Sequence, residues 1–159
     1  MVDFNISHDG DWVIAGYTAQ GFIGVDIAKI SCPANMTDID YIKEFVYQLS
    51  IKEMDYLVNS SQQTLLDFYR IWTAKEAYVK AIGAGIAEFD LCSISVHLVQ
   101  PAGNPRVYIN GKESEFYFKS GTLDAEDYVY CIATSSEPNC AFSTTDLLDF
   151  IESSHRTAI

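Results

Sequence analysis

The strongest constraint in this sequence is a stretch from Phe68 to Gly85 that reads FYRIWTAKEAYVKAIGAG. Plotted at about 100° per residue, its apolar side chains fall on one face, which predicts a helix packed on a core. Lys75 lies in the middle of that face, and Glu76 and Lys80 lie along its edge. A buried ammonium group is costly unless it is paired, so the face indicates a site.

A structural explanation is also open at this point. Lys75 would then extend past its apolar neighbours to water, as long basic side chains do. Glu76 and Lys80 would form an ordinary surface pair, worth about 0.2–0.5 kcal/mol. The end of the helix is clearer, because Gly83 and Gly85 follow Ile82, as glycine at a helix C-terminus predicts.

Composition narrows the class of protein. The 159 residues are 48% hydrophobic, which is typical of one globular domain with its own core. The formal charge of −12 argues against a nucleic-acid surface. No membrane span or signal peptide is evident. The cysteines carry no CxxC pair, which predicts reduced thiols and a cytoplasmic protein; they are Cys32, Cys92, Cys131 and Cys140.

Local patterns predict one α+β domain, with helices packed on a mostly antiparallel sheet. In the first half we expect strands at Phe4–Ile6, Trp12–Tyr17 and Phe22–Ile27, with a turn at Ser7–Gly10. We expect three helices there: one from Thr37-Asp38 to Leu49, one at Ile51–Val58, and one from a Ser60-Ser61 cap to Ile82. In the second half we expect strands at Ser93–Val99, Arg106–Ile109, Glu115–Ser120 and Tyr128–Ser135, a hairpin turn at Asn110-Gly111, and a short helix at Asp146–Glu152.

Three short segments carry residues suited to chemistry. They read FNISHDG at 4–10, GVDI at 24–27 and WTAKEAYVK at 72–80. Asp26 stands in an apolar strand, where its charge needs a partner or a metal ion. A capped strand end would explain Asp26 equally well.

Together, in this order, the three segments resemble the 4′-phosphopantetheinyl transferase superfamily. The matching patterns are N-x-SH, G-x-D-I and W-x-x-KE-A-x-x-K-x-x-G-x-G, within residues 4–86. The resemblance implies the lobe fold of that family and holo-[carrier protein] synthase activity. In that reaction, 4′-phosphopantetheine passes from coenzyme A to a serine of an acyl or peptidyl carrier protein. Mg²⁺ is required, and adenosine 3′,5′-bisphosphate is released.

The resemblance also implies roles for residues at matching positions. Asp26 and Glu76 correspond to the metal carboxylates, and Glu76 also to the general base that acts on the carrier serine. Lys80 corresponds to a cation that stabilises the phosphoryl oxygens during transfer.

Further positions of the motifs have roles by the same resemblance. Ser7 and His8 would hold a phosphate of coenzyme A, and Lys75 is assigned a phosphate contact. We expect Trp72 to pack and to fix the helix.

One departure concerns the metal ligands. Many bacterial members read G-x-D-I-E, whereas Ala28 stands at the last position here, so one ligand is missing. In the larger eukaryotic members, which act on aminoadipate reductase and fatty-acid synthase carriers, a polar residue after the SH histidine can replace it. That residue is Asp9, so we hypothesise that Asp9, Asp26 and Glu76 jointly hold Mg²⁺. A plain turn at Asp9-Gly10 is the alternative.

A second departure concerns length. Two-lobed members place the active site between two similar lobes, and residues 1–159 carry the motifs of one. We therefore expect the C-terminal lobe, with the N-terminal lobe as a partner absent from this chain. A natural short trimer is the alternative, although such members usually begin at the G-x-D-I-E segment. The rival function is a non-catalytic module that binds a carrier protein or a sister subunit, motivated by the few basic residues and Ala28.

Overall fold

The computed structural model of the chain describes residues 2–85, 89–99 and 103–137. The strands are β1 (Asp3–Asp9), β2 (Trp12–Thr18), β3 (Ile23–Lys29), β4 (Ile94–His97), β5 (Arg106–Ile109), β6 (Lys112–Glu113), β7 (Tyr117–Leu123) and β8 (Tyr128–Thr134). The helices are α1 (Asp38–Lys43), α2 (Ile51–Asn59) and α3 (Thr64–Ala81), with short 3₁₀ turns η1 (Leu91–Ser93) and η2 (Asp124–Glu126).

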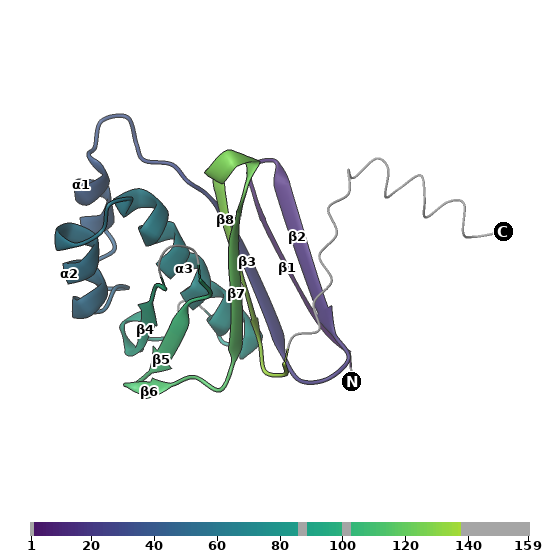
Figure 1. The fold of residues 1–159 in the computed structure, drawn as a ribbon. Helices are drawn as coiled ribbons and strands as arrows, with labels where there is room; N and C mark the ends of the chain where they lie inside the picture. Colours follow the sequence, from purple (N-terminus) through teal and green to yellow (C-terminus); the bar gives the residue numbers. More distant parts are fainter. Residues whose placement is uncertain (1, 86–88, 100–102, 138–159) are drawn as a thin grey trace.

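The long helix α3 lies across one face of a central antiparallel sheet with strand order β3-β8-β7, and α1 and α2 lie on the other side of α3 (Figure 1). A small antiparallel sheet, β4-β5-β6, packs beside them. The predicted α+β class with antiparallel sheets is therefore confirmed. The core joins α3 to β8 and its neighbours; it includes Phe68, Ile71, Ala74, Val79, Ile94, Val107, Val129 and Cys131.

Several predicted elements agree closely with the structure. Thr37 caps α1, because its side-chain oxygen accepts a hydrogen bond from the Asp40 backbone nitrogen at 3.2 Å. The Asn110-Gly111 turn joins β5 to β6, and both residues have positive φ, 51° and 81°. The expected helix at Asp146–Glu152 lies outside the described residues.

Other boundaries differ from the prediction. Helix α1 ends at Lys43, and tight turns rather than helix carry the chain to Leu49. Helix α3 begins at Thr64, not after Ser60-Ser61. The reason is local, because the Ser61 hydroxyl donates to the buried Asp67 carboxylate at 2.7 Å instead of capping the helix.

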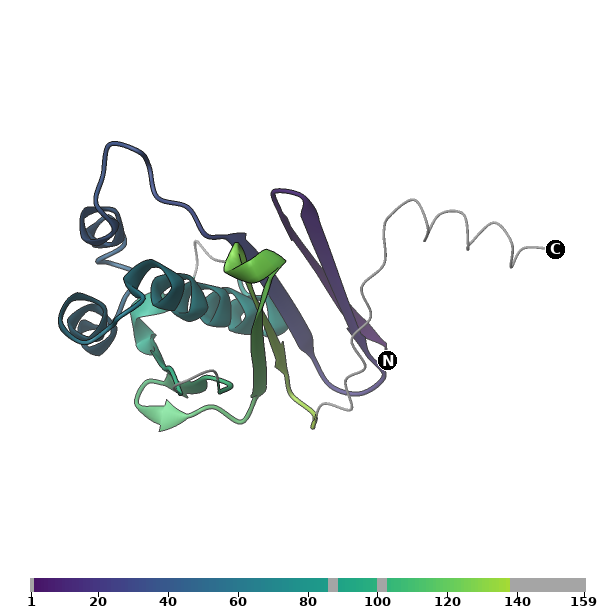
Figure 2. The same cartoon turned by 45° about the horizontal axis from the view of Figure 1, so that its top comes forward.

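The hairpin β1–β2 lies beside β3, on the side away from α3 (Figure 2). The residues predicted as a turn, Ser7–Asp9, belong to strand β1. The polar residues of β1 face β3, while large apolar side chains of the hairpin face outward, which is the reverse of the usual arrangement; we call this an inside-out hairpin. The outward side chains and their exposed fractions are Phe4 68%, Ile6 54%, Val13 65% and Tyr17 80%.

Within the described ranges, no helix is long and apolar enough to cross a bilayer.

The backbones of β3 and α3 approach closely at Gly24. A Cβ atom on Gly24 would collide with the carbonyl oxygen of Ala77 and the backbone nitrogen of Ala81. Glycine in the strand and alanine in the helix are therefore both required for this crossing. The crossing brings Lys80, next to Ala81, over the edge of β3.

We expect Gly24→Ala to lower the free energy of unfolding by at least about 3 kcal/mol, the upper part of the range for overpacked cores. The added methyl group would meet backbone atoms, which cannot rotate away. Chemical denaturation followed by circular dichroism measures the change.

Gly111→Ala is the control. No atom lies within 4 Å of a Cβ at Gly111, so this variant should lose only the cost of a left-handed backbone, about 1–2 kcal/mol. Equal stability of Gly24→Ala and the parent would contradict the close crossing.

Candidate functional site

A pocket of about 470 Å³ opens between β1, β3, the α1 region and α3. Its two ends differ in chemistry. The polar end is lined by Ser7, His8, Asp9, Asp26, Glu76 and Lys80, and the aromatic end by Tyr41, Phe45, Phe68, Tyr69 and Trp72. The pocket thus gathers residues from all three motif segments.

Lys80 and Asp26 form the centre of the polar end. The Lys80 ammonium lies 2.7 Å from Asp26 Oδ1 and also donates to Ser7 Oγ at 3.0 Å and to the Val25 carbonyl at 3.3 Å. The Ser7 hydroxyl donates to the same Asp26 oxygen at 2.9 Å. Helix α3 and strands β1 and β3 are therefore joined through one carboxylate.

Glu76 faces this group with an unsatisfied oxygen. Its residue is 4% exposed, and Oε1 has no hydrogen-bond partner in the described part of the chain. The pKa of Glu76 is raised to about 7, mainly by burial and also by the nearby Asp26 charge, while the Lys80 charge opposes the shift. Glu76 is thus poised to gain or lose a proton near neutral pH.

Asp26 also has a raised pKa. Burial is the largest cause; the Lys80 charge and the hydrogen bonds from Lys80 and Ser7 oppose it, and Asp9 adds a smaller increase. Asp26 and Glu76 are two buried carboxylates, one of them with an orphan buried oxygen, and carboxylate oxygens are the donors that a divalent cation such as Mg²⁺ requires. The residues Asp26 and Glu76 therefore fit such an ion.

Asp9 is less closely associated with this pair. Its Oδ2 accepts a hydrogen bond of 2.7 Å from the Lys29 backbone nitrogen. Within residues 2–85, 89–99 and 103–137, no three His, Cys, Asp or Glu side chains form a group that could hold a metal ion. The hypothesised triad of Asp9, Asp26 and Glu76 is therefore not assembled in this arrangement.

The side chain of His8 lies on the opposite face of β1 from the side chain of Ser7, because side chains alternate along a strand. Ser7 is buried toward β3, whereas His8 is exposed on the outward face of the hairpin, opposite Val13 in the β1–β2 register. His8 still lines the pocket rim. It therefore borders both the pocket and the exposed apolar face of the hairpin.

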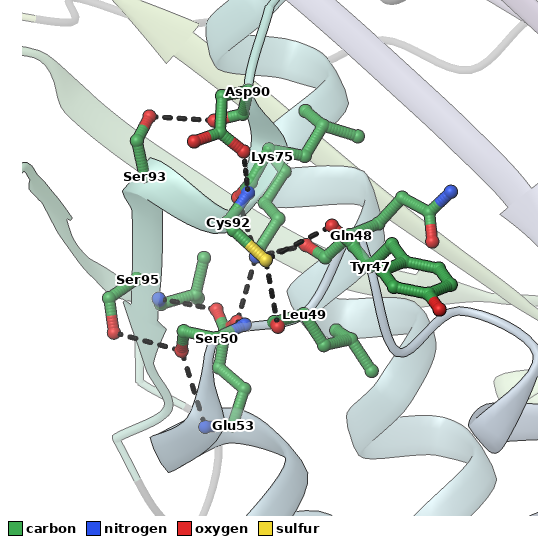
Figure 3. A network of polar contacts seen from close by, with 12 residues as sticks. Tyr47, Gln48, Leu49, Ser50, Glu53, Lys75, Asp90, Cys92, Ser93 and Ser95 are labelled. Atoms are coloured by element: carbon green, nitrogen blue, oxygen red, sulfur yellow. Dashed lines mark hydrogen bonds and ion pairs between the residues drawn. The ribbon is translucent and has the colours of Figure 1, made fainter.

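Lys75 lies apart from the other predicted site residues. It is fully buried and does not line the pocket. Its ammonium pairs with Glu53 Oε2 at 2.7 Å and donates to the carbonyls of Gln48 at 2.7 Å and Leu91 at 3.0 Å (Figure 3). Burial lowers the pKa of Lys75, and the Glu53 charge opposes that shift. This placement does not provide the phosphate contact expected for Lys75.

Glu53 is the residue that sequence reasoning missed. Besides pairing with Lys75, it accepts hydrogen bonds from the Ser50 nitrogen at 2.6 Å and the Val96 nitrogen at 2.7 Å. A local signal was available, because Ser50 and Glu53 form a capping box at the start of α2. The pairing with Lys75, 22 residues away, had no signal in the sequence.

Several known proteins are similar to this chain. A model of the 4′-phosphopantetheinyl transferase superfamily matches residues 22–133. The human L-aminoadipate-semialdehyde dehydrogenase-phosphopantetheinyl transferase is 30% identical over 136 residues, which cover 80% of this chain and 44% of the human protein. The 4′-phosphopantetheinyl transferase Sfp of Bacillus subtilis is 31% identical over 121 residues, 76% of this chain and 50% of that protein. The chain thus spans about half the length of these relatives.

Two solved structures share the fold. The holo-(acyl-carrier-protein) synthase of Bacillus anthracis, in complex with CoA (3′,5′-ADP), gives a TM-score of 0.51 at 21% identity, covering 72% of this chain and 96% of that chain. The Thermotoga maritima holo-[acyl-carrier-protein] synthase gives a TM-score of 0.51 at 14% identity, covering 70% and 61%. These likenesses support the fold, and the family match bears out the resemblance inferred from the three motifs.

We expect Lys75→Met to lower the free energy of unfolding by about 3–5 kcal/mol, because it leaves the Glu53 carboxylate buried without its cation. The double variant Lys75→Met/Glu53→Gln should be more stable than Lys75→Met. Denaturant titrations of the single and double variants measure this coupling.

Arg106→Met is the matched control. Arg106 pairs with Glu113 in an exposed salt bridge, so its loss should cost no more than about 1 kcal/mol. A Lys75→Met variant as stable as the Arg106→Met variant would contradict the assigned role of Lys75.

The raised pKa of Glu76 predicts a pH-dependent stability. In the unfolded chain this carboxyl has its ordinary pKa of 4.5, against about 7 in the folded chain. The stability contributed by the bound proton is therefore complete below the unfolded value and is lost as the pH rises through about 7. In EDTA, the free energy of unfolding should fall more steeply as the pH rises from about 4.5 to about 7 in the parent than in Glu76→Gln.

Carboxyl ¹³C NMR provides the direct measurement. The Glu76 resonance should titrate with a midpoint near 7, and Lys80→Met should move that midpoint upward because a favourable cation is lost. A midpoint near the ordinary glutamate value would refute the prediction.

Proposed function

Because this chain belongs to the 4′-phosphopantetheinyl transferase superfamily, we propose that it is the catalytic lobe of an enzyme that transfers 4′-phosphopantetheine from coenzyme A to a serine of a carrier protein. One observation carries the proposal. Glu76, with a pKa of about 7 and an unsatisfied oxygen, faces a carboxylate–ammonium pair, Asp26 and Lys80, in a single pocket.

The reaction joins the carrier serine to the phosphate that bears pantetheine. The serine oxygen forms a bond to that phosphorus, the pyrophosphate bond breaks, and adenosine 3′,5′-bisphosphate leaves. Glu76 accepts the serine proton, directly or through one water molecule. A pKa near the working pH favours this role, because the carboxylate is available as a base and its conjugate acid is stable enough to form.

Lys80 stabilises the charge on the phosphoryl oxygens. Its contact with the Val25 carbonyl, at 3.3 Å, is the longest of its three and is the one most easily exchanged for a phosphate oxygen. His8 is proposed to hold a phosphate of coenzyme A from the pocket rim. Ser7 shares that proposed role, and its hydroxyl first positions Asp26 and Lys80.

Asp26 and Glu76 would hold Mg²⁺, which supplies positive charge to the pyrophosphate when it is bound. Asp9 remains the proposed third ligand, because it lines the same pocket and Ala28 offers no donor atom. Its carboxylate would have to serve the ion together with its hydrogen bond from Lys29.

We propose that a second, N-terminal lobe completes the site. The chain spans 44% of the human relative, and the outward face of the β1–β2 hairpin exposes Phe4, Ile6, Val13 and Tyr17. Buried polar residues with exposed apolar ones indicate a face that another surface covers. His8 lies on that face, so a docked lobe would border the phosphate site.

The carrier is proposed to be of the fatty-acid synthase or aminoadipate reductase type, by likeness to the animal relatives.

The alternative function is that of a binding module without transfer. Ala28, which lines the pocket where many members carry a carboxylate, favours that alternative.

Transfer of a fluorescent coenzyme A conjugate to an apo carrier protein tests the proposal. We expect weak transfer by the isolated chain and full transfer when an N-terminal lobe precedes it. In that longer protein, Glu76→Gln and Lys80→Met should each lower kcat by about 100-fold or more. Arg106→Met, far from the pocket, should not change it.

Three outcomes are decisive. Absence of transfer by the folded two-lobed protein, with calorimetric binding of coenzyme A and Mg²⁺, would favour the binding module. Full activity of Glu76→Gln would remove Glu76 as the base. An unchanged Mg²⁺ dependence in Asp9→Ala would remove Asp9 as a ligand.

A further inference from the structure

Strand β1 is joined to β3 through side chains and not through a backbone ladder. Four side-chain oxygens of β1 accept hydrogen bonds from four backbone nitrogens of β3, and each pair is 20 residues apart. The pairs are Asp3 with Ile23 at 2.9 Å, Asn5 with Val25 at 3.1 Å, Ser7 with Ile27 at 3.4 Å, and Asp9 with Lys29 at 2.7 Å. We call this row the β1–β3 seam.

The seam satisfies the free edge of the central sheet. β3 pairs with β8 on one side only, so the N–H groups of alternate residues point away from the sheet. Such groups need acceptors, and an uncovered edge invites wrong pairing. In this chain the acceptors are side chains at every second position of β1.

The seam is continuous with the site. Asn5 accepts from the Val25 nitrogen, and Lys80 donates to the Val25 carbonyl, so both backbone polar groups of this residue of β3 bind side chains. The next member, Ser7, accepts from Lys80 and donates to Asp26. A shift of β1 along β3 would therefore move the Ser7 hydroxyl away from the Asp26–Lys80 pair.

The observed register places a hydroxyl beside Asp26. The position must accept from Lys80 and donate to a carboxylate, which a hydroxyl does and an ionised carboxylate cannot do. A slip of one residue would turn Phe4, Ile6 and His8 toward β3. A slip of two would bring Asn5 or the carboxylate of Asp9 to the place of Ser7.

The tip of the hairpin is fastened independently. The Asp11 backbone nitrogen donates to the Tyr128 hydroxyl at 3.2 Å, and the Trp12 indole donates to Asp124 in the η2 turn. A Cβ on Gly10 would collide with the same Tyr128 hydroxyl. The tip thus fixes one end, and Asp3 and Asn5 are the seam members that lie beyond Ser7, toward the open end of the hairpin.

We propose that Asn5 and Asp3 are positioning residues, which set the register of β1 on β3 and thereby place Ser7 against Asp26 and Lys80. Neither residue lines the pocket. The effect on coenzyme A rests on the proposed function; the hydrogen bonds of the seam do not.

Amide hydrogen exchange in this chain tests the seam. In Asn5→Ala the Val25 amide should exchange about tenfold faster than in the parent, because it loses its acceptor. The amides of Gly24 and Asp26, which face β8, should keep their protection. Asn5→Asp, which retains an acceptor oxygen, should preserve the Val25 protection even if Asn5→Ala proves too unstable to measure.

Thr18→Val is the matched control. Thr18 lies in the same hairpin, and among the described residues its hydroxyl bonds only to the Gln20 backbone, so the variant loses a hydrogen bond outside the seam. Val25 exchange should be unchanged. Parent-like protection of Val25 in a folded Asn5→Ala variant would overturn the seam.

Steady-state kinetics of the two-lobed protein tests the positioning role. Asn5→Ala should raise the KM for coenzyme A several-fold and leave the KM for the carrier unchanged, and Asn5→Asp should restore the parent value. Fast Val25 exchange with unchanged kinetics would overturn the positioning role alone. A parent protein without transfer activity would refute the proposed function, while the exchange result would still decide the seam.

Discussion

The site depends on the close crossing of β3 and α3 at Gly24. Without a side chain at that position, the strand lies directly against the backbone of Ala77 and Ala81. Lys80 then projects past the strand edge and reaches the Val25 carbonyl and Asp26. The glycine of G-x-D-I and the alanines that flank Lys80 are therefore parts of one steric arrangement, although they lie in different motifs.

Helix α3 carries adjacent charges that serve opposite sides of the fold. The Lys75 ammonium enters the core and binds Glu53 together with two backbone carbonyls, which ties the chain before α2 to η1 (Figure 3). Glu76 turns into the pocket, where an oxygen is left without a partner among the described residues. Lys75 is paired with a carboxylate and with backbone carbonyls, so its charge stabilises the fold. Glu76 keeps an oxygen without a hydrogen-bond partner among the described residues, so it is available for chemistry.

The helical wheel predicted correctly that Lys75 stands on a buried face and needs a partner, but its partner Glu53 lies in another element. The same limit applies to β1. The sequence predicted a turn at Ser7–Gly10, whereas the structure continues β1 to Asp9 and places Asp3, Asn5 and Ser7 on the side that faces β3. Neighbouring residues fix which side chains lie together; long-range packing decides whether water or protein covers them. Asp26, Glu76 and Lys80 were recognisable because they stand in ordered motifs that resemble those of the 4′-phosphopantetheinyl transferase superfamily.

The inside-out hairpin also has a consequence for how such proteins are assembled in evolution. The edge of β3 is covered by side chains of β1 and not by a further strand of the same sheet. A junction with another protein segment before Asp3 would therefore interrupt no backbone ladder of the described sheets. Fusion, fission or exchange of coding sequence at that point would leave the central sheet intact and would alter only what covers the apolar side of the hairpin. The start of β1 is thus a natural boundary for modular recombination, and all residues that line the candidate pocket follow it in the sequence.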